Sequence, residues 1–165
     1  MRSMTLSEVE TSLDANLFGV DRTFSRVCTD SRHIFPGDVF VALKGANLDG
    51  HNFLDAVRLA GVPAILCKGT DYDLSKLEVE DTQLALGGLG AINRTLFPGF
   101  VAAITGSSGK TTVKNLVTSV FAKKAPTIGS KGNFNNEIGV PLTLLSINPS
   151  HEFAVIELGA GKPGD

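Results

Sequence analysis

Residues 100–116 read FVAAITGSSGKTTVKNL and contain the change of pattern that decides the fold. Phe100–Ile104 is a continuous apolar run, which is typical of a buried strand. From Lys110 on, apolar residues recur at helical spacing, which predicts a helix over residues 110–123. The residues expected to face inward are Val113, Leu116, Val117 and Val120. The stretch therefore predicts a strand–loop–helix corner of a parallel α/β domain.

This corner has the chemistry of a phosphate-binding loop. Gly106 and Gly109 have no Cβ atoms, so backbone N–H groups can curl around an anion at the positive end of the following helix. Lys110 adds a mobile charge for the β and γ phosphates, and Thr111 offers a hydroxyl to Mg²⁺. The pattern G-x-x-x-x-G-K-[ST] would require glycine where Ile104 stands, so the first glycine is displaced by two positions. The predicted ATP-binding residues of the loop are Thr105, Gly106, Ser107, Ser108, Gly109, Lys110, Thr111 and Thr112. A glycine-rich turn with an exposed lysine is the alternative.

A second apolar strand, Phe153–Ile156, delivers Glu157 at its carboxyl end. Strand, helix and strand in this order imply a parallel sheet with a right-handed crossover. Ligands bind in the crevice outside the carboxyl ends of such strands, so Glu157 and Thr111 are predicted to hold Mg²⁺. Lys110 and Glu157 are the predicted catalytic residues. The alternative for Glu157 is a solvent-exposed carboxylate at a strand end.

The chain divides into two kinds of sequence, and we predict a boundary between residues 97 and 98, at the break Leu96-Phe97-Pro98-Gly99. Residues 1–97 predict a small α/β domain. Its expected elements are a capping-box helix from Thr5, strands at 27–29, 39–43 and 64–67, helices at 51–60 and 82–94, and a polar stretch at 68–80. Residues 98–165 predict the first part of a parallel α/β ATPase domain, with no helix to cover its last strand. We therefore expect the sequence to be a fragment of a longer protein.

Composition narrows the class of protein. Of the 165 residues, 42% are hydrophobic and 19% are charged, which excludes a disordered chain. The net charge of −2 comes without a basic cluster, so nucleic acid is not an expected partner. No apolar run reaches membrane-spanning length, and the start MRSMTLSEVE has no signal-peptide core. Cys28 and Cys67 have no metal-ligand spacing and are expected to be reduced thiols, which predicts a cytoplasmic protein.

Three segments resemble the Mur ligase family, the ATP-dependent enzymes that build the peptide stem of bacterial cell-wall precursors. The first is TDSRHIFPGDVFVALKGANLDGHNF, residues 29–53, which is similar to the family's uridine-diphosphate-binding domain. The second is ITGSSGKTTVK, residues 104–114, the family's own variant of the phosphate loop. The third is GNFNNEIGVPLTLL, residues 132–145, followed by AVIELGA, residues 154–160. Its Asn-Asn-Glu-Ile-Gly-Val-Pro run resembles the member that joins D-alanyl-D-alanine to UDP-N-acetylmuramoyl-tripeptide.

The resemblance implies a reaction and its participants. The terminal carboxylate of the tripeptide attacks ATP to give an acyl phosphate, which the amine of D-alanyl-D-alanine then attacks, with Mg²⁺ as cofactor. It also implies that Asn135 and Asn136 lie near the phosphates or the metal. The residues that it places around UDP are Ser31, Arg32, Lys44, Ala46, Asn47 and Asp49. From the residues alone, adjacent asparagines are more often turn formers, and Asp30-Ser31-Arg32 is equally a strand-ending turn with an internal ion pair.

Other functions stay open at this point. One is another Mur-type ligase that adds a single amino acid, and a second is a module that binds the UDP precursor without catalysis. A phosphate-loop GTPase or kinase would leave residues 1–97 unexplained, and no guanine-reading Asn-Lys-x-Asp motif is present. We expect a monomer, and a fragment that is inactive by itself.

Overall fold

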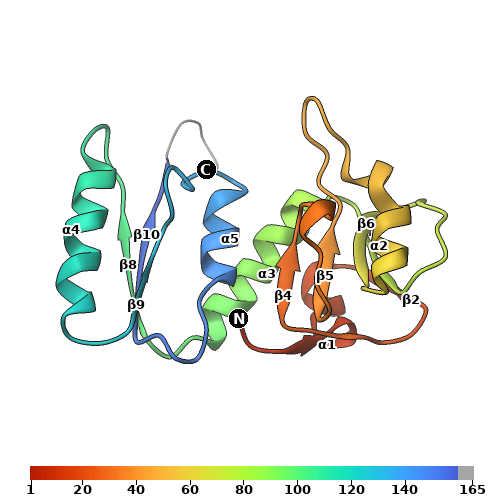
Figure 1. Ribbon diagram of the computed structural model, residues 1–165, viewed down its shortest axis with the longest axis horizontal. Coiled ribbons are helices and arrows are strands. Elements are labelled where there is room, and N and C mark those ends of the chain that lie inside the picture. Colours follow the sequence, from red (N-terminus) through yellow and green to blue (C-terminus); the bar gives the residue numbers. More distant parts are fainter. Residues whose placement is uncertain (160–165) are drawn as a thin grey trace. The chain divides into compact units, whose positions relative to one another are not determined.

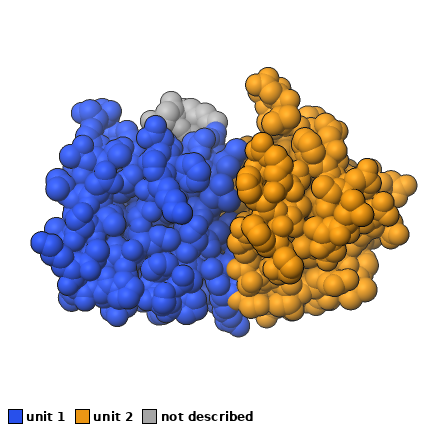
Figure 2. All heavy atoms as spheres, in the orientation of Figure 1, with its two compact units in different colours: residues 1–2, 90–165 blue, residues 3–89 orange. Residues whose placement is uncertain are grey.

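The computed structural model describes residues 1–159, which form two compact units (Figure 2). One unit comprises residues 3–89, and the other comprises residues 1–2 together with the chain from residue 90. The division falls within helix α3 (Thr82–Leu96). The domain boundary at residues 97–98 stays a prediction. Within the described part of the chain, no helix has the length and apolar character that a membrane span requires.

The first unit is built on a five-stranded sheet in the order β2-β7-β6-β5-β4 (Figure 1). Its strands are β2 (Asn16–Phe18), β4 (Arg26–Cys28), β5 (Asp38–Val41), β6 (Ala64–Cys67) and β7 (Lys76–Val79), and β1 (Met4–Thr5) pairs separately with β3 (Thr23–Phe24). Its helices are α1 (Leu6–Glu10) and α2 (Leu54–Ala60), with 3-10 turns η1 (Thr11–Leu13), η2 (Ser31–His33) and η3 (Gly50–Phe53). Neighbouring strands from β4 to β7 run parallel, and only β2 is antiparallel.

Local sequence explains how this unit begins. Thr5 caps α1 by accepting a hydrogen bond from the amide of Glu8, whose carboxylate accepts one from the amide of Thr5, so the predicted capping box is confirmed. Leu54 and Val57 on α2 pack on Phe40 of β5, with further apolar residues of β6. Gly61 ends α2 in the left-handed conformation with φ +68°, as a glycine after a helix commonly does.

Two strands of this sheet, β2 and β7, were not predicted from the sequence. Strand β7 lies in the stretch that was expected to be a polar connection, yet Lys76 is buried there. Its ammonium lies 2.9 Å from a Glu78 carboxylate oxygen and donates to the carbonyl of Thr70 at 2.6 Å. Because these partners compensate its charge, a lysine fits a strand position that a pattern of apolar residues would not find.

The second unit is a three-layer arrangement. Its sheet has the order β8-β10-β9, all parallel, formed by β8 (Phe100–Ile104), β9 (Thr127–Gly129) and β10 (Phe153–Glu157). Helices α4 (Lys110–Ala122) and α5 (Gly139–Leu145) cover opposite faces of it (Figure 1). Strand β9 was not predicted from the sequence. The α/β class with parallel sheets is confirmed.

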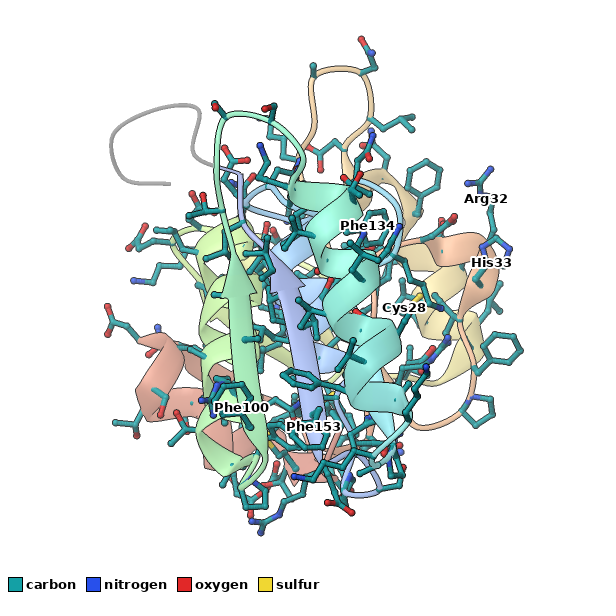
Figure 3. The ribbon with its side chains drawn as sticks, turned by 90° about the vertical axis from the view of Figure 1, so that its left-hand side faces the viewer. Cys28, Arg32, His33, Phe100, Phe134 and Phe153 are labelled. Atoms are coloured by element: carbon teal, nitrogen blue, oxygen red, sulfur yellow. The ribbon has the colours of Figure 1, made fainter. Side chains whose placement is uncertain are left out.

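The predicted inward face of α4 is wrong for three of its four residues. Val113, Leu116 and Val120 are 45%, 62% and 64% exposed. The face that packs on the sheet is instead formed by Lys114, Val117, Thr118 and Phe121. This packed face contains a lysine and a threonine, so the apolar pattern did not indicate it, and Lys114 can be buried there because Glu157 lies 3.3 Å from its ammonium. Phe121 stacks on Phe153 at 4.7 Å between ring centroids, and Phe153 lies beside Phe100 (Figure 3).

Candidate functional site

The loop between β8 and α4 has the backbone geometry that its glycines suggested. Gly106 has φ +150° and Gly109 has φ +74°, both in the region that favours glycine. Gly109 is the N-cap of α4, so the loop ends at the positive end of a helix of 13 residues. The Lys110 ammonium donates to the carbonyl of Gly106 at 2.6 Å, which folds this side chain over its own loop.

Glu157 lies at the carboxyl end of β10, in register with Ile104 at the end of β8. Its side chain is only 2% exposed, so it is not the solvent-exposed glutamate of the alternative reading. Oxygen Oε1 accepts hydrogen bonds from the Thr111 hydroxyl at 3.2 Å and the Asn135 amide at 3.0 Å. The backbone amide of Glu157 donates to the hydroxyl of Ser130 at 3.0 Å. Three segments of the unit thus meet at one carboxylate.

Lys114 is a member of this site to which the sequence reading gave no role. It is 3% exposed, its Nζ lies 3.3 Å from Oε2 of Glu157, and it donates to the carbonyl of Gly132 at 3.1 Å. The contact with Glu157 meets the distance of an ion pair but not the geometry of a hydrogen bond, so Oε2 has no hydrogen-bond partner among the described residues. One signal was present in the sequence: Lys114 stands three positions after Thr111, on the same helix face.

The charge of Glu157 is set by opposing effects. Burial raises the pKa of this carboxyl group, while hydrogen bonds from Asn135 and Thr111 and the ammonium of Lys114 lower it, and the net direction is downward. The group is therefore an ionised carboxylate at neutral pH.

The two predicted asparagines occupy different positions. Asn135 contacts Glu157, and its carbonyl accepts from the amide of Gly159 at 2.7 Å. The side-chain oxygen of Asn136 instead accepts from the amides of Ile138 and Gly139, at the start of α5. Asn136 acts as a turn former, and its contact with nucleotide stays a prediction.

The donor set suits a hard cation. Mg²⁺ takes oxygen ligands and is commonly held by one or two carboxylates together with phosphates and water. Here a buried oxygen of Glu157 without a hydrogen-bond partner lies in the same carboxylate as an oxygen contacted by the Thr111 hydroxyl. These residues fit a magnesium ion next to the glycine loop between β8 and α4.

The predicted UDP residues lie in the first unit, after two adjacent parallel strands. Ser31 and Arg32 form turn η2 after β4, where Asp30 accepts bonds from the Arg32 guanidinium at 2.9 and 2.7 Å. These bonds, with one from the Arg32 amide, lower the pKa of Asp30. Arg32 and His33 project outward (Figure 3), and the Arg32 side chain is 81% exposed. The internal ion pair of the alternative reading is therefore present, on a side chain that solvent reaches.

The remaining UDP candidates, Lys44, Ala46, Asn47 and Asp49, lie in the loop after β5. The carboxyl ends of parallel β4 and β5 share one edge of the sheet, so the structure brings the two groups of candidates to the same edge. Asp49 accepts from the amide of His51 at 2.9 Å and contacts its Nδ1 at 2.6 Å. Nε2 of His51 accepts from the amide of Cys67 at 3.0 Å, so the proton lies on Nδ1 and points to Asp49. Both ring nitrogens of His51 therefore have hydrogen-bond partners within the protein.

Comparisons with known proteins agree in one family. Residues 23–89 match the family model "Mur ligase family, catalytic domain", and residues 104–165 match "Mur ligase middle domain". The chain is 45% identical over 166 residues to UDP-N-acetylmuramoyl-tripeptide–D-alanyl-D-alanine ligase of Escherichia coli (strain K12). The aligned region covers 100% of this chain and 37% of that protein.

Two solved structures extend the similarity. A UDP-N-acetylmuramoylalanyl-D-glutamyl-2,6-diaminopimelate–D-alanyl-D-alanyl ligase from Acinetobacter baumannii has a TM-score of 0.90 and 39% identity, over 100% of this chain and 38% of that one. The MurF ligase from Thermotoga maritima, solved in complex with ADP, has a TM-score of 0.77 and 35% identity, over 84% of this chain and 33% of that one. The chain spans between 33% and 38% of the length of these relatives.

Proposed function

Because the chain belongs to the Mur ligase family, we propose that it is part of an ATP-dependent ligase that joins D-alanyl-D-alanine to UDP-N-acetylmuramoyl-tripeptide. The observation that carries the proposal is the convergence of Thr111, Asn135 and Glu157 beside the glycine loop. The names of the similar ligases from Escherichia coli and Acinetobacter baumannii support the choice of substrates.

The reaction has two balanced steps. A carboxylate oxygen of the tripeptide attacks the γ-phosphorus of ATP, the bond to the β-phosphate oxygen breaks, and ADP leaves. The amine of D-alanyl-D-alanine then attacks the acyl carbon and loses a proton as the amide forms, and inorganic phosphate leaves. Since both the carboxylate and the triphosphate are anions, the protein must position them against their repulsion.

The residues of the second unit have the properties that this positioning needs. Lys110 would move from the Gly106 carbonyl to the outer phosphates and offset part of their charge. Gly106 and Gly109 have positive φ and no Cβ atom, so the loop can turn backbone amides toward an anion at these two positions. Asn135 would keep the carboxylate of Glu157 aligned while the nucleotide enters.

Thr111 and Glu157 are the residues that would hold Mg²⁺. When bound, the cation supplies charge neutralisation for the phosphate oxygens. Before it binds, the Thr111 hydroxyl donates to Oε1 of Glu157, so both prospective ligands are already adjacent. Asn136 would contact the phosphates only through its amide group, because its oxygen accepts two backbone bonds.

The first unit would hold the UDP part of the substrate at the edge formed by β4 and β5. Arg32 is a suitable partner for a diphosphate because its guanidinium is exposed and carries several donors. Ser31, Lys44, Ala46, Asn47 and Asp49 complete the proposed contacts. We also propose that the enzyme is a monomer in the cytoplasm, where its free cysteines would stay reduced.

The test is an assay of phosphate release by the full-length protein. We expect release only with ATP, UDP-N-acetylmuramoyl-tripeptide and D-alanyl-D-alanine together. Release with a single amino acid in place of the dipeptide would favour another Mur-type ligase. Binding of the UDP precursor without any release would favour a non-catalytic module. Both results would contradict the proposal.

A further inference from the structure

Lys114 lies at the junction of the segments that form the nucleotide end of the second unit. It is part of α4, one turn beyond Thr111, and its ammonium contacts both Glu157 on β10 and the carbonyl of Gly132. Gly132 precedes Asn135 by three residues in the connection between β9 and α5. One buried cation therefore contacts both of the segments that supply Asn135 and Glu157.

The contacts of the Glu157 carboxylate are divided between its two oxygens. Thr111 and Asn135 both donate to Oε1, whereas Lys114 lies at Oε2. A carboxylate can rotate about its last bond unless both oxygens are held. Among the described residues, Lys114 is the side chain that contacts the second oxygen, so it restricts rotation of the carboxylate and sets the direction in which Oε1 faces Thr111.

A surface lysine would not perform this task. The Lys114 side chain is 3% exposed and that of Glu157 is 2% exposed. In such surroundings an ion pair costs desolvation of both groups, so burial of the pair is weak evidence of a gain in stability. The same pair does restrict the orientation of the carboxylate, and groups that orient a metal ligand commonly control metal affinity.

We propose that Lys114 is a positioning residue of the nucleotide–metal site, which sets the orientation of Glu157 toward the magnesium of bound nucleotide. This inference rests on the proposed function, because it assumes that Glu157 receives the metal. Lys114 itself touches neither the metal nor the phosphates in this assignment. Its effect should therefore appear in the metal-dependent part of nucleotide binding, and not in binding as a whole.

The experiment is calorimetry of the full-length protein with ADP, once with MgCl₂ and once with EDTA. We expect the wild type to bind ADP more tightly with magnesium. Lys114→Met keeps an unbranched side chain without charge, and should reduce this magnesium-dependent gain by about 10-fold to 100-fold. Its affinity for ADP in EDTA, which depends on the loop and Lys110, should change less than the affinity in magnesium.

Two further variants separate positioning from a purely structural role. Lys114→Gln can still donate a hydrogen bond but has no charge, and serves if Lys114→Met does not fold; it should also lose the gain. Lys123→Met removes an exposed lysine from the end of the same helix and should keep the gain. Circular dichroism gives the temperature range in which each variant is folded.

The outcomes are distinguishable. If the wild type does not bind ADP, or shows no gain with magnesium, the proposed function fails. If the wild type shows the gain and the folded Lys114 variants retain or increase it, the assignment of Lys114 is wrong. An equal loss with magnesium and with EDTA would also overturn it, because a merely structural defect weakens both.

Discussion

The two candidate binding edges of the molecule are held together in opposite ways. In the first unit, Asp30 bonds to Arg32 and His33, two and three residues away. In the second unit, Glu157 bonds to Asn135, Ser130 and Thr111, at separations of 22, 27 and 46 residues. The Arg32 side chain is 81% exposed, whereas that of Glu157 is 2% exposed.

The difference has a physical consequence. Exposed local pairs are solvated before and after folding, so their removal changes stability little, although it can change what the surface binds. A buried pair between distant segments exists only in the folded protein, and loss of one partner leaves the other charge without compensation. Substitutions at the second edge should therefore affect stability and function together, and those at the first edge mainly function.

The largest effect on stability is expected for Glu157→Ala. This change leaves the Lys114 ammonium buried without a counter-charge, which should lower the free energy of unfolding by about 3–5 kcal/mol. Urea unfolding measures it, with Glu152→Ala as the matched control at an exposed glutamate just before β10. The double variant Glu157→Gln/Lys114→Met should recover a large part of the loss. A loss below 1 kcal/mol for Glu157→Ala, similar to the usual surface change, would contradict the burial of the pair.

A smaller effect is expected for Gly109→Ala in the loop between β8 and α4. A Cβ at this position would meet no atom within 4 Å, so the change tests only the backbone conformation at φ +74°. An alanine there should cost about 1–2 kcal/mol. Gly87→Ala is the control, because a Cβ at this site inside α3 also meets nothing within 4 Å, and it should instead stabilise by about 0.5–1 kcal/mol. If both substitutions change the unfolding free energy in the same direction relative to the wild type, the loop does not hold Gly109 in this conformation.

The third prediction concerns the pH dependence of the first edge. The backbone amide and the ring of His51 lower the pKa of Asp49 below its ordinary value of 3.8. A lowered pKa contributes stability above the unfolded value, and this contribution disappears as pH falls through the folded value. Asp49→Asn should therefore be less stable than the wild type at neutral pH, with the difference shrinking below about pH 4. Unfolding curves across this range measure it, with exposed Asp71→Asn as control. If the difference in stability between the wild type and Asp49→Asn instead increases as the pH falls, folding does not lower the pKa of Asp49.

The same contrast explains which features could be predicted from the sequence. Strands β6 and β8, helix α3 and the position of Glu157 at the end of β10 follow from local patterns of apolar residues and glycines. Strands β2, β7 and β9 are short or polar and depend on partners elsewhere in the chain, so no local pattern indicates them. Lys114 is the clearest case at the site. From the sequence, a lysine on a helix is expected to be exposed. Lys114 is buried because Glu157, 43 positions later in the chain, lies next to it and balances its charge.

The smallest effect on stability, and the sharpest separation of the two edges, is expected for Arg32→Ala. The guanidinium bonds only to Asp30 in its own turn among the described residues, so the midpoint of unfolding should stay within error of the wild type. If Arg32 binds the diphosphate, loss of its charged hydrogen bonds should weaken UDP binding by about tenfold or more, as measured by calorimetry. Arg58→Ala removes another exposed arginine, paired with Asp55 at 3.6 Å on α2, and should change neither quantity. If Arg32→Ala binds UDP as tightly as the wild type, Arg32 is not part of the substrate site. A clear loss of stability would mean that this edge, like the second, depends on its ion pair for folding.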